Sequence, residues 1–239
     1  MKKILYSVAL AACCMGTMTS CSDFLDASNK SNVTAKQSFA TKEGLNNLVN
    51  NAYQHLQNVY AAPLFTSCFS AGTDMYADAR NKMNEALNTY ETLTPENTDI
   101  KNLYTYLYSG IRAANSVSYY AQTAQVDDKT KGQLVGEARV LAAYEYYLLV
   151  NNFGGVPIMK DFLTTADTGY PKSSAEDVYA YIISELEDVI GKNVLQASTA
   201  TKGGGRISQE TAKAILAKTY LSAAWDLNKQ EYFSKAAAL

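Results

Sequence analysis

The sequence contains few of the residue types that build metal sites and catalytic relays. Its 239 residues include a single histidine, His55, and only four cysteines. His55 borders an apolar helical stripe and has no second histidine with which to bind zinc or relay protons, so we interpret it as a flank residue. Serine-elbow, zinc-ligand and Cys-x-x-Cys patterns are also absent from the sequence. We therefore expect no catalytic residue, no metal and no cofactor.

Charges of the two signs are nearly balanced. The chain has 21 Lys and Arg against 23 Asp and Glu, a formal net charge of -2, and no dense basic run. Nucleic acid is therefore not an expected partner. The glycine run at 203–205 lacks the Gly-Lys-Ser/Thr that must follow in a phosphate-binding loop, so we interpret residues 196–205 as a flexible linker.

The amino terminus has the pattern of a lipoprotein signal peptide. Two lysines precede an apolar stretch, Ile4 to Met18, and small residues stand directly before Cys21. The stretch is too short for a convincing membrane-spanning helix. Cys13 also follows a suitable Leu-Ala-Ala triplet, but cleavage there would leave an apolar core of only Ile4 to Leu10. We therefore predict a signal peptide at 1–20 and a lipid attached to Cys21, which anchors the chain to a membrane.

This cleavage decides how the remaining cysteines can be used. Cys13 and Cys14 leave with the signal peptide, and acylation consumes the Cys21 thiol. Only Cys68 then remains, so an intrachain disulfide is impossible and the fold depends on its core. We expect Cys68 to be a buried, unreactive thiol.

A long helix is the clearest element of the sequence. Side chains at 134–149 recur at spacings of three and four, which gives two neighbouring rows and a wide apolar stripe. Gly154 can adopt the left-handed conformation that ends a helix, and Pro157 cannot continue one. We expect the helix to end at Phe153 and the chain to leave it in an extended conformation.

Four further amphipathic helices are predicted from the same periodicity. The expected N-terminal residues of the five helices, in chain order, are Thr41, Thr94, Asp127, Ser174 and Ser208. The first helix should end before Pro63, the second should run to about Ala121, and the fourth should end at Gly191.

Three motifs, in order along the chain, resemble the SusD/RagB family. The first is Cys-Ser-Asp-Phe-Leu-Asp at 21–26, and the second joins Glu-Ala-Arg at 137–139 to Phe-Gly-Gly-Val-Pro at 153–157. The third is Gly-Arg-Ile-Ser at 205–208, ahead of an Ala/Leu/Tyr helical pattern. One position departs from the family pattern, because the family usually has an arginine where this chain has Ala142. The contacts that this arginine makes in the family are therefore in doubt for this chain, whereas the helix is still expected.

SusD/RagB proteins are helical outer-membrane lipoproteins that capture nutrients, mostly glycans, for a TonB-dependent transporter. The resemblance implies an all-α fold of tetratricopeptide-like stacked helix pairs with long loops. It divides the chain into the signal peptide, a lipidated tether at 21–40 and a helical domain at 41–239. Residues 138–146 also align with 212–220 at an offset of about two tetratricopeptide units, which fits stacked pairs.

The same resemblance implies the function and the partners. The protein would be a lipid-anchored, surface-exposed outer-membrane protein that binds a nutrient such as a glycan and delivers it to a SusC-like TonB-dependent transporter. Family members are usually about twice this long, and the chain stops inside a helix-forming run at 229–239. We therefore expect a helical stack that is truncated at its carboxyl end.

The candidate ligand site lies between the first two long helices. Residues 67–90 lose the helical period and combine aromatic rings, carboxylates and an arginine, which are side chains that bind sugars by stacking and bidentate hydrogen bonds. The residues singled out as ligand contacts are Asp74, Tyr76, Arg80, Asn81 and Tyr90. An ordinary polar surface loop would have much the same composition.

Two other functions are compatible with the sequence. A tetratricopeptide-type scaffold that binds a protein segment would use the same helices, although the lipidated start favours nutrient capture. An all-helical glycosidase could use Asp74 and Asp78, which a helix would place on one face. Hydrolases need the two carboxyl groups opposed across the substrate, however, and the sequence marks no second wall.

Overall fold

Helices make up the regular structure of the part of the chain that the computed structural model describes, residues 34–61, 63–76, 85–165, 169–198 and 205–239. In chain order these helices are α3 (Ala35–Ser38), α4 (Lys42–Tyr60), α5 (Leu64–Phe69), α6 (Glu85–Thr89), α7 (Thr98–Ala121), α8 (Asp128–Phe153), α9 (Ala175–Lys192), α10 (Gln209–Asp226) and α11 (Glu231–Ala237). Within those ranges the one strand-like pairing is an isolated bridge between Thr73 and Tyr76. The all-α prediction is therefore confirmed. None of these helices is long and apolar enough to cross a bilayer.

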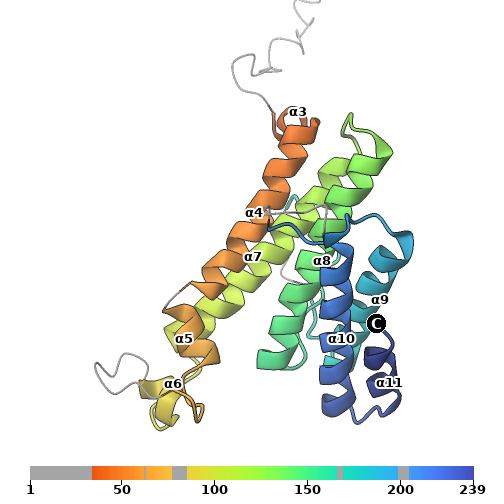
Figure 1. The fold of residues 1–239 in the computed structure, drawn as a ribbon. Helices are drawn as coiled ribbons and strands as arrows, with labels where there is room; N and C mark the ends of the chain where they lie inside the picture. The colour runs from red at the N-terminus through yellow and green to blue at the C-terminus, as the bar shows by residue number, and fades with distance from the viewer. Residues whose placement is uncertain (1–33, 62, 77–84, 166–168, 199–204) are drawn as a thin grey trace, which may run out of the picture. The chain divides into compact units, whose positions relative to one another are not determined.

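The long helices form a stack in which each packs on the next. The chain divides into two units at residue 35, and the stack lies in the second, residues 36–239. Helix α4 packs on α7, α7 on α8, α8 on α9, α9 on α10 and α10 on α11 (Figure 1). This arrangement matches the tetratricopeptide-like pairs that the sequence predicts.

Two tyrosines related by the internal repeat each meet a ring of the next helix. Tyr146 of α8 meets Tyr181 of α9 with ring centroids 5.3 Å apart, and Tyr220 of α10 meets Tyr232 of α11 at 5.2 Å. Tyr146 and Tyr220 are separated by the 74-residue offset seen in the sequence, whereas their partners are not. The repeat is therefore visible in α8 and α10 but does not extend to the helices that they contact.

A continuous apolar core runs through the seams of the stack. Its largest fully buried aliphatic side chains are Leu45, Leu107, Ile111, Leu141, Leu149, Ile182, Leu186 and Leu216, which come from every long helix. Burying such a side chain contributes about 1.5–3 kcal/mol. At the carboxyl end of the stack the ring of Trp225 is 77% exposed.

Capping side chains begin four of the helices where the sequence predicts. Thr41, Asp127, Ser174 and Ser208 each accept a hydrogen bond from the backbone N–H three residues on, at 2.9–3.1 Å. Ser174 also forms a reciprocal capping box with Asp177. These bonds satisfy N–H groups that have no partner inside the helix.

Two predicted helix ends are wrong by a few residues. Helix α7 is capped by Asn97, whose side-chain oxygen accepts from the N–H groups of Asp99 and Ile100, and not by Thr94. The backbone carbonyl of Thr94 instead accepts from the N–H of Asn97 in the turn before the helix, and Pro95 and Glu96 lie outside the helix. Helix α9 passes through the predicted terminator Gly191 and ends at Lys192, and its cap Asn193 takes the left-handed conformation at φ 50°.

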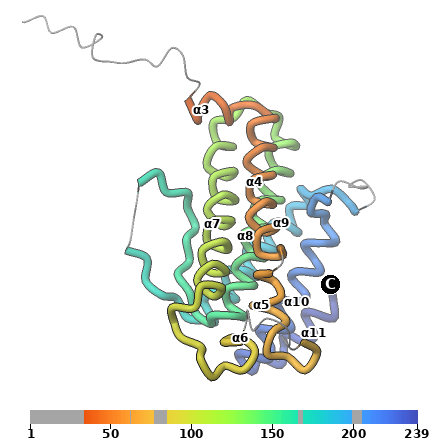
Figure 2. The backbone as a smooth tube through the Cα atoms, turned by 90° about the vertical axis from the view of Figure 1, so that its left-hand side faces the viewer, coloured from red at the N-terminus to blue at the C-terminus, as the bar shows by residue number. Residues whose placement is uncertain are grey.

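The chain leaves α8 in the way the double glycine predicts. Gly154 has a φ of 67°, and a side chain on Gly155 would lie 2.2 Å from the carbonyl oxygen of Ser173. The exit segment then runs along α7, where Tyr108 donates to the carbonyl of Pro157 and Asn115 to that of Met159. Figure 2 shows this segment beside α7.

Candidate functional site

The described residues of the segment proposed from the sequence as the ligand site include regular structure. It contains the short helices α5 and α6, which the loss of periodicity did not predict. Between them Asp74 is exposed in a tight turn, and the half-buried Tyr76 donates its N–H to the carbonyl of Thr73 at 3.3 Å. Asp74 is therefore not on a helix, as the glycosidase alternative would require. Arg80 and Asn81 lie outside the described residues, as do Asp78 and Cys21.

A hollow of about 430 Å³ lies where α5 and α6 meet the start of α7 and the end of α8. Its lining is formed by Ser67, Cys68, Ala71, Leu87, Tyr90, Leu93, Ile100, Leu103, Asn151, Asn152 and Phe153. Of the predicted ligand contacts that the structure describes, Tyr90 lines this hollow, whereas Asp74 and Tyr76 lie in the adjoining turn and do not. The structure thus assigns one predicted residue to a concave surface.

The position of Tyr90 depends on close packing against a glycine. Tyr90 has a positive φ of 63°, which is uncommon for a residue with a side chain, and it is 57% exposed. A Cβ atom at Gly72 would lie 2.1 Å from the Tyr90 hydroxyl oxygen, and Gly72 itself has a φ of 73°. Only glycine fits this contact without displacing the ring.

Polar groups reach the hollow from the end of α8. Asn151 and Asn152 donate their side-chain N–H groups to the carbonyls of Tyr147 and Leu148, each at 2.7 Å. These bonds fix the two amides, and their oxygen atoms remain available as acceptors. Sequence reasoning missed both asparagines, although a pair of amides just before a glycine helix stop is a visible signal.

The cysteine in the lining is not a reactive group. Cys68 is half-buried, and burial together with the nearby Asp99 raises the pKa of its thiol to about 11. The thiol is therefore protonated at neutral pH, in agreement with the unreactive role predicted for it. The described residues contain no group of three or more His, Cys, Asp or Glu that could hold a metal ion.

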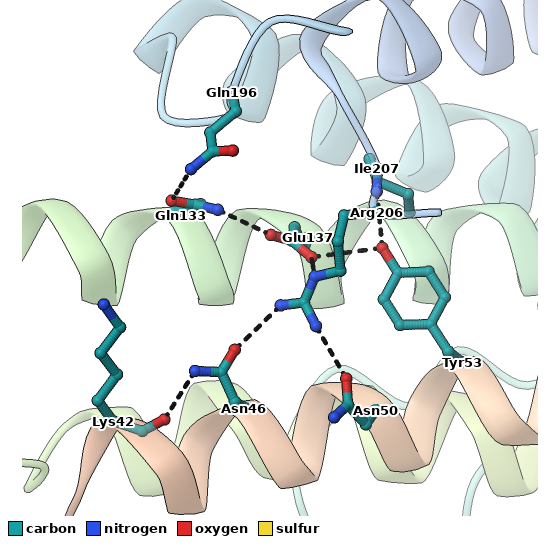
Figure 3. Close-up of polar contacts among 9 residues, drawn as sticks. All are labelled: Lys42, Asn46, Asn50, Tyr53, Gln133, Glu137, Gln196, Arg206 and Ile207. Atoms are coloured by element: carbon teal, nitrogen blue, oxygen red, sulfur yellow. Dashed lines mark hydrogen bonds and ion pairs between the residues drawn. The ribbon is translucent and has the colours of Figure 1, made fainter. Parts of the chain in front are cut away.

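The signature residues form a separate, structural network (Figure 3). The fully buried carboxylate of Glu137 accepts from the Arg206 guanidinium at 2.7 Å, from Gln133 at 3.1 Å and from the Tyr53 hydroxyl at 3.3 Å. The Tyr53 oxygen in turn accepts from the N–H of Ile207 at 2.7 Å.

This network joins three parts of the stack. Arg206 also donates to Asn50 at 2.8 Å and to Asn46 at 3.2 Å, so one guanidinium bridges α4 and α8 just before α10. A buried carboxylate needs such partners. The presence of Glu in the Glu-Ala-Arg motif and of Arg in the Gly-Arg-Ile-Ser motif is therefore explained by their buried ion pair within the stack. Neither residue lines the hollow at Tyr90.

The neighbouring signature positions also act within the stack. Arg139 pairs with Glu185 at 2.7 Å and with Asp188 at 2.5 Å, which ties α8 to α9. Ala142, where the arginine of the resembling family is missing, is 5% exposed and lines a hollow of about 330 Å³ with Tyr181 and Glu185. Helix α8 is continuous through this position, as expected.

Solved structures resemble this stack. Surface glycan-binding protein A from Bacteroides uniformis aligns with a TM-score of 0.68 and 26% identity, over 81% of this chain and 44% of that one. A SusD homologue from Bacteroides thetaiotaomicron aligns with a TM-score of 0.71 and 21% identity, over 88% of this chain and 42% of its own. A laminarin-binding SusD-like protein aligns with a TM-score of 0.67 and 22% identity, over 80% of this chain and 42% of that one. The last two likenesses concern the fold alone.

Sequence comparisons identify the family. A SusD-like protein of Bacteroides ovatus is 28% identical over 134 residues, which are 54% of this chain and 24% of that protein. A SusD-like protein of Formosa agariphila is 28% identical over 179 residues, 73% of this chain and 34% of its own. The chain thus spans about a quarter to a third of the length of these relatives. A SusD-like family profile, described as "Starch-binding associating with outer membrane", matches residues 23–221, and the chain therefore belongs to the SusD/RagB family.

Proposed function

We propose that this protein binds a glycan at the outer membrane and delivers it to a SusC-like TonB-dependent transporter, without making or breaking bonds. The observation that carries the proposal is the family match over residues 23–221, whose description names both starch and the outer membrane. The relative from Bacteroides uniformis is a surface glycan-binding protein, which supports a saccharide ligand.

The proposed glycan contact is the hollow at Tyr90. An exposed tyrosine ring offers a face on which the apolar side of a sugar can stack, and the oxygens of Asn151 and Asn152 can accept from its hydroxyl groups. We further propose that the ligand extends over the adjoining turn, where Asp74 and Tyr76 lie. Arg80 and Asn81, outside the described residues, belong to the same proposal.

The proposed location rests on the amino terminus. Acylation of Cys21 would hold the helical stack at the outer membrane, exposed at the surface and beside its transporter. A lipid anchor suits a binding protein because it confines the ligand near the transporter and leaves the helices in water.

A glycan array followed by titration of the best ligand tests the binding site. Tyr90→Ala and Tyr76→Ala should each weaken binding by about 1–3 kcal/mol, since each removes an aromatic contact and its buried area. Tyr119→Ala is a matched control because Tyr119 is 44% exposed but lies outside the hollow. Unchanged affinity in both site variants, or an equal loss in the control, would contradict the proposed site.

A further inference from the structure

A second hollow lies on the other side of α7 from the seam with α8 and has a different chemistry. It encloses about 360 Å³, within the range of about 300–1,000 Å³ found for small-molecule sites. Its walls come from α4, α7 and the exit segment that follows α8, and its lining consists of Phe39, Leu48, Asn51, His55, Ser109, Arg112, Ala113, Ser116, Tyr120 and Phe162. It shares no lining residue with the hollow at Tyr90.

Arg112 is the charged group of this second hollow. Its guanidinium lies 5.7 Å from the centre of the Phe162 ring and forms no ion pair with any described residue. The described lining of the hollow contains no carboxylate. Asp161 lines an adjoining hollow of about 270 Å³, to which Arg112 also contributes, and forms no ion pair with it. The cation is thus held in place by an aromatic face while its N–H fork remains available to an anion.

His55 adds an unsatisfied polar atom. Its Nδ1 is buried and has no hydrogen-bond partner among the described groups. Burial also lowers the pKa of the imidazole, so the ring is neutral at pH 7 and can donate from one nitrogen. Asn51, exposed at the rim, offers an amide donor to the same space.

The remaining wall is aromatic and keeps its shape through ring contacts. Phe162 lies 5.9 Å from Tyr120, and Tyr120 lies 4.8 Å from Phe39, measured between ring centroids. These rings come from three separate segments and form an apolar surface beside the polar donors. A ligand that fits must therefore have both an anionic group and an apolar face.

We propose that this hollow is a second ligand site, which takes a carboxylate-bearing ligand the size of one sugar, such as a hexuronate. The carboxylate would accept two parallel N–H bonds from Arg112, a planar geometry that favours carboxylates. A ring hydroxyl would accept from the Asn51 amide at the rim, and the apolar side of the sugar would lie against the aromatic wall. This site is independent of the glycan site proposed at Tyr90.

The single histidine makes the test direct. Because His55 is the only histidine in the sequence, its ring signals in an NMR titration of the purified, untagged full chain report on this hollow alone. Glucuronate should shift these signals in a saturable way, and glucose at the same concentration should not. Equal shifts with glucose, or no saturation with glucuronate, would overturn the proposal.

Matched variants identify the recognising group. Arg112→Gln should weaken glucuronate binding at least tenfold, whereas Lys101→Gln, which removes another exposed cation of α7 outside the hollow, should bind as wild type does. Arg112→Lys keeps the positive charge but loses the planar pair of N–H donors. Its affinity for glucuronate should therefore lie between those of wild type and Arg112→Gln. Tyr90→Ala should leave glucuronate binding unchanged, so failure at one site is distinguishable from failure at the other. Equal affinity of Arg112→Gln and wild type would refute the assignment.

Discussion

Glu145 is a buried carboxyl group without a hydrogen-bond partner among the described residues. It lies in the seam between α7 and α8 and is fully buried, and both side-chain oxygens lack partners. A Cβ atom at Gly110 would lie 1.7 Å from one of these oxygens, so the glycine of α7 makes room for the carboxyl group. Burial raises the pKa of Glu145 well above its usual range, which means that the folded protein holds this group protonated.

This burial predicts a pH-dependent loss of stability. The pKa of Glu145 is higher in the folded than in the unfolded protein. The contribution of Glu145 to the free energy of unfolding is therefore fully present below the unfolded pKa, and it falls as the pH rises toward the folded pKa. The slope within that window is about 1.4 kcal/mol per pH unit. Glu145→Gln cannot ionise and should be more stable than wild type at pH 8, with little difference at pH 4.

Urea unfolding at the two pH values measures this effect. Glu91→Gln, which changes an exposed glutamate, is the control and should follow wild type at both. If Glu145→Gln and wild type lose the same free energy of unfolding between pH 4 and pH 8, the carboxyl group is not held protonated.

Gly72 provides a second test at the level of one residue. Gly72→Ala combines a strained positive φ with a contact of 2.1 Å to the Tyr90 hydroxyl, so the ring must move. Glycan affinity should then fall about as far as it does in Tyr90→Ala. Gly191→Ala is the matched control because no atom lies within 4 Å of its added Cβ, and within α9 it should stabilise by about 0.5–1 kcal/mol. Retention of full affinity by Gly72→Ala would show that the ring position does not matter.

At the scale of elements, one arginine should hold three segments together. Arg206→Ala leaves the fully buried Glu137 carboxylate without its cation, and breaking such a pair costs about 3–5 kcal/mol. Lys229→Ala removes one half of an exposed pair with Glu176, which is worth about 0–1 kcal/mol. Chemical denaturation of the two variants compares these values. Similar losses would mean that the network contributes little beyond a surface pair.

Element boundaries could be predicted where a local signal decides them. Thr41, Ser174 and Ser208 cap their helices from within three residues, and the Gly154 turn needs only its own φ, so sequence alone located them. Helices α5 and α6 are six and five residues long, too short to show a hydrophobic period or to be stable alone. Helix α5 packs against α7 and α4, and α6 packs against α5, contacts that no local pattern reveals.

At the scale of the whole molecule, both proposed sites are products of the stack. The hollow at Tyr90 joins residues from α5, α6, α7 and α8, and the hollow at Arg112 joins α4 and α7 to the segment after α8. Tyr90 could be singled out because its own segment is polar and aromatic. Phe162 could not, because the chain brings it to its site through long-range contacts. The sequence thus predicted the fold more fully than the sites.

The lipid anchor is the remaining whole-molecule prediction, and the two candidate cysteines allow a paired test. Acylation at Cys21 places several long chains on the mature protein, each buried methylene contributing about 0.8 kcal/mol, so the protein should partition with the outer membrane. Cys21→Ser should lose both lipid labelling and membrane partition, because it removes the sulfur atom that carries the lipid. Cys13→Ser should keep both, since cleavage at Cys21 removes residue 13 with the signal peptide. Metabolic labelling with a fatty acid, followed by fractionation and intact-mass measurement, distinguishes them. If Cys13→Ser loses the label and Cys21→Ser retains it, the mature protein begins at Cys13 and the predicted tether is eight residues longer.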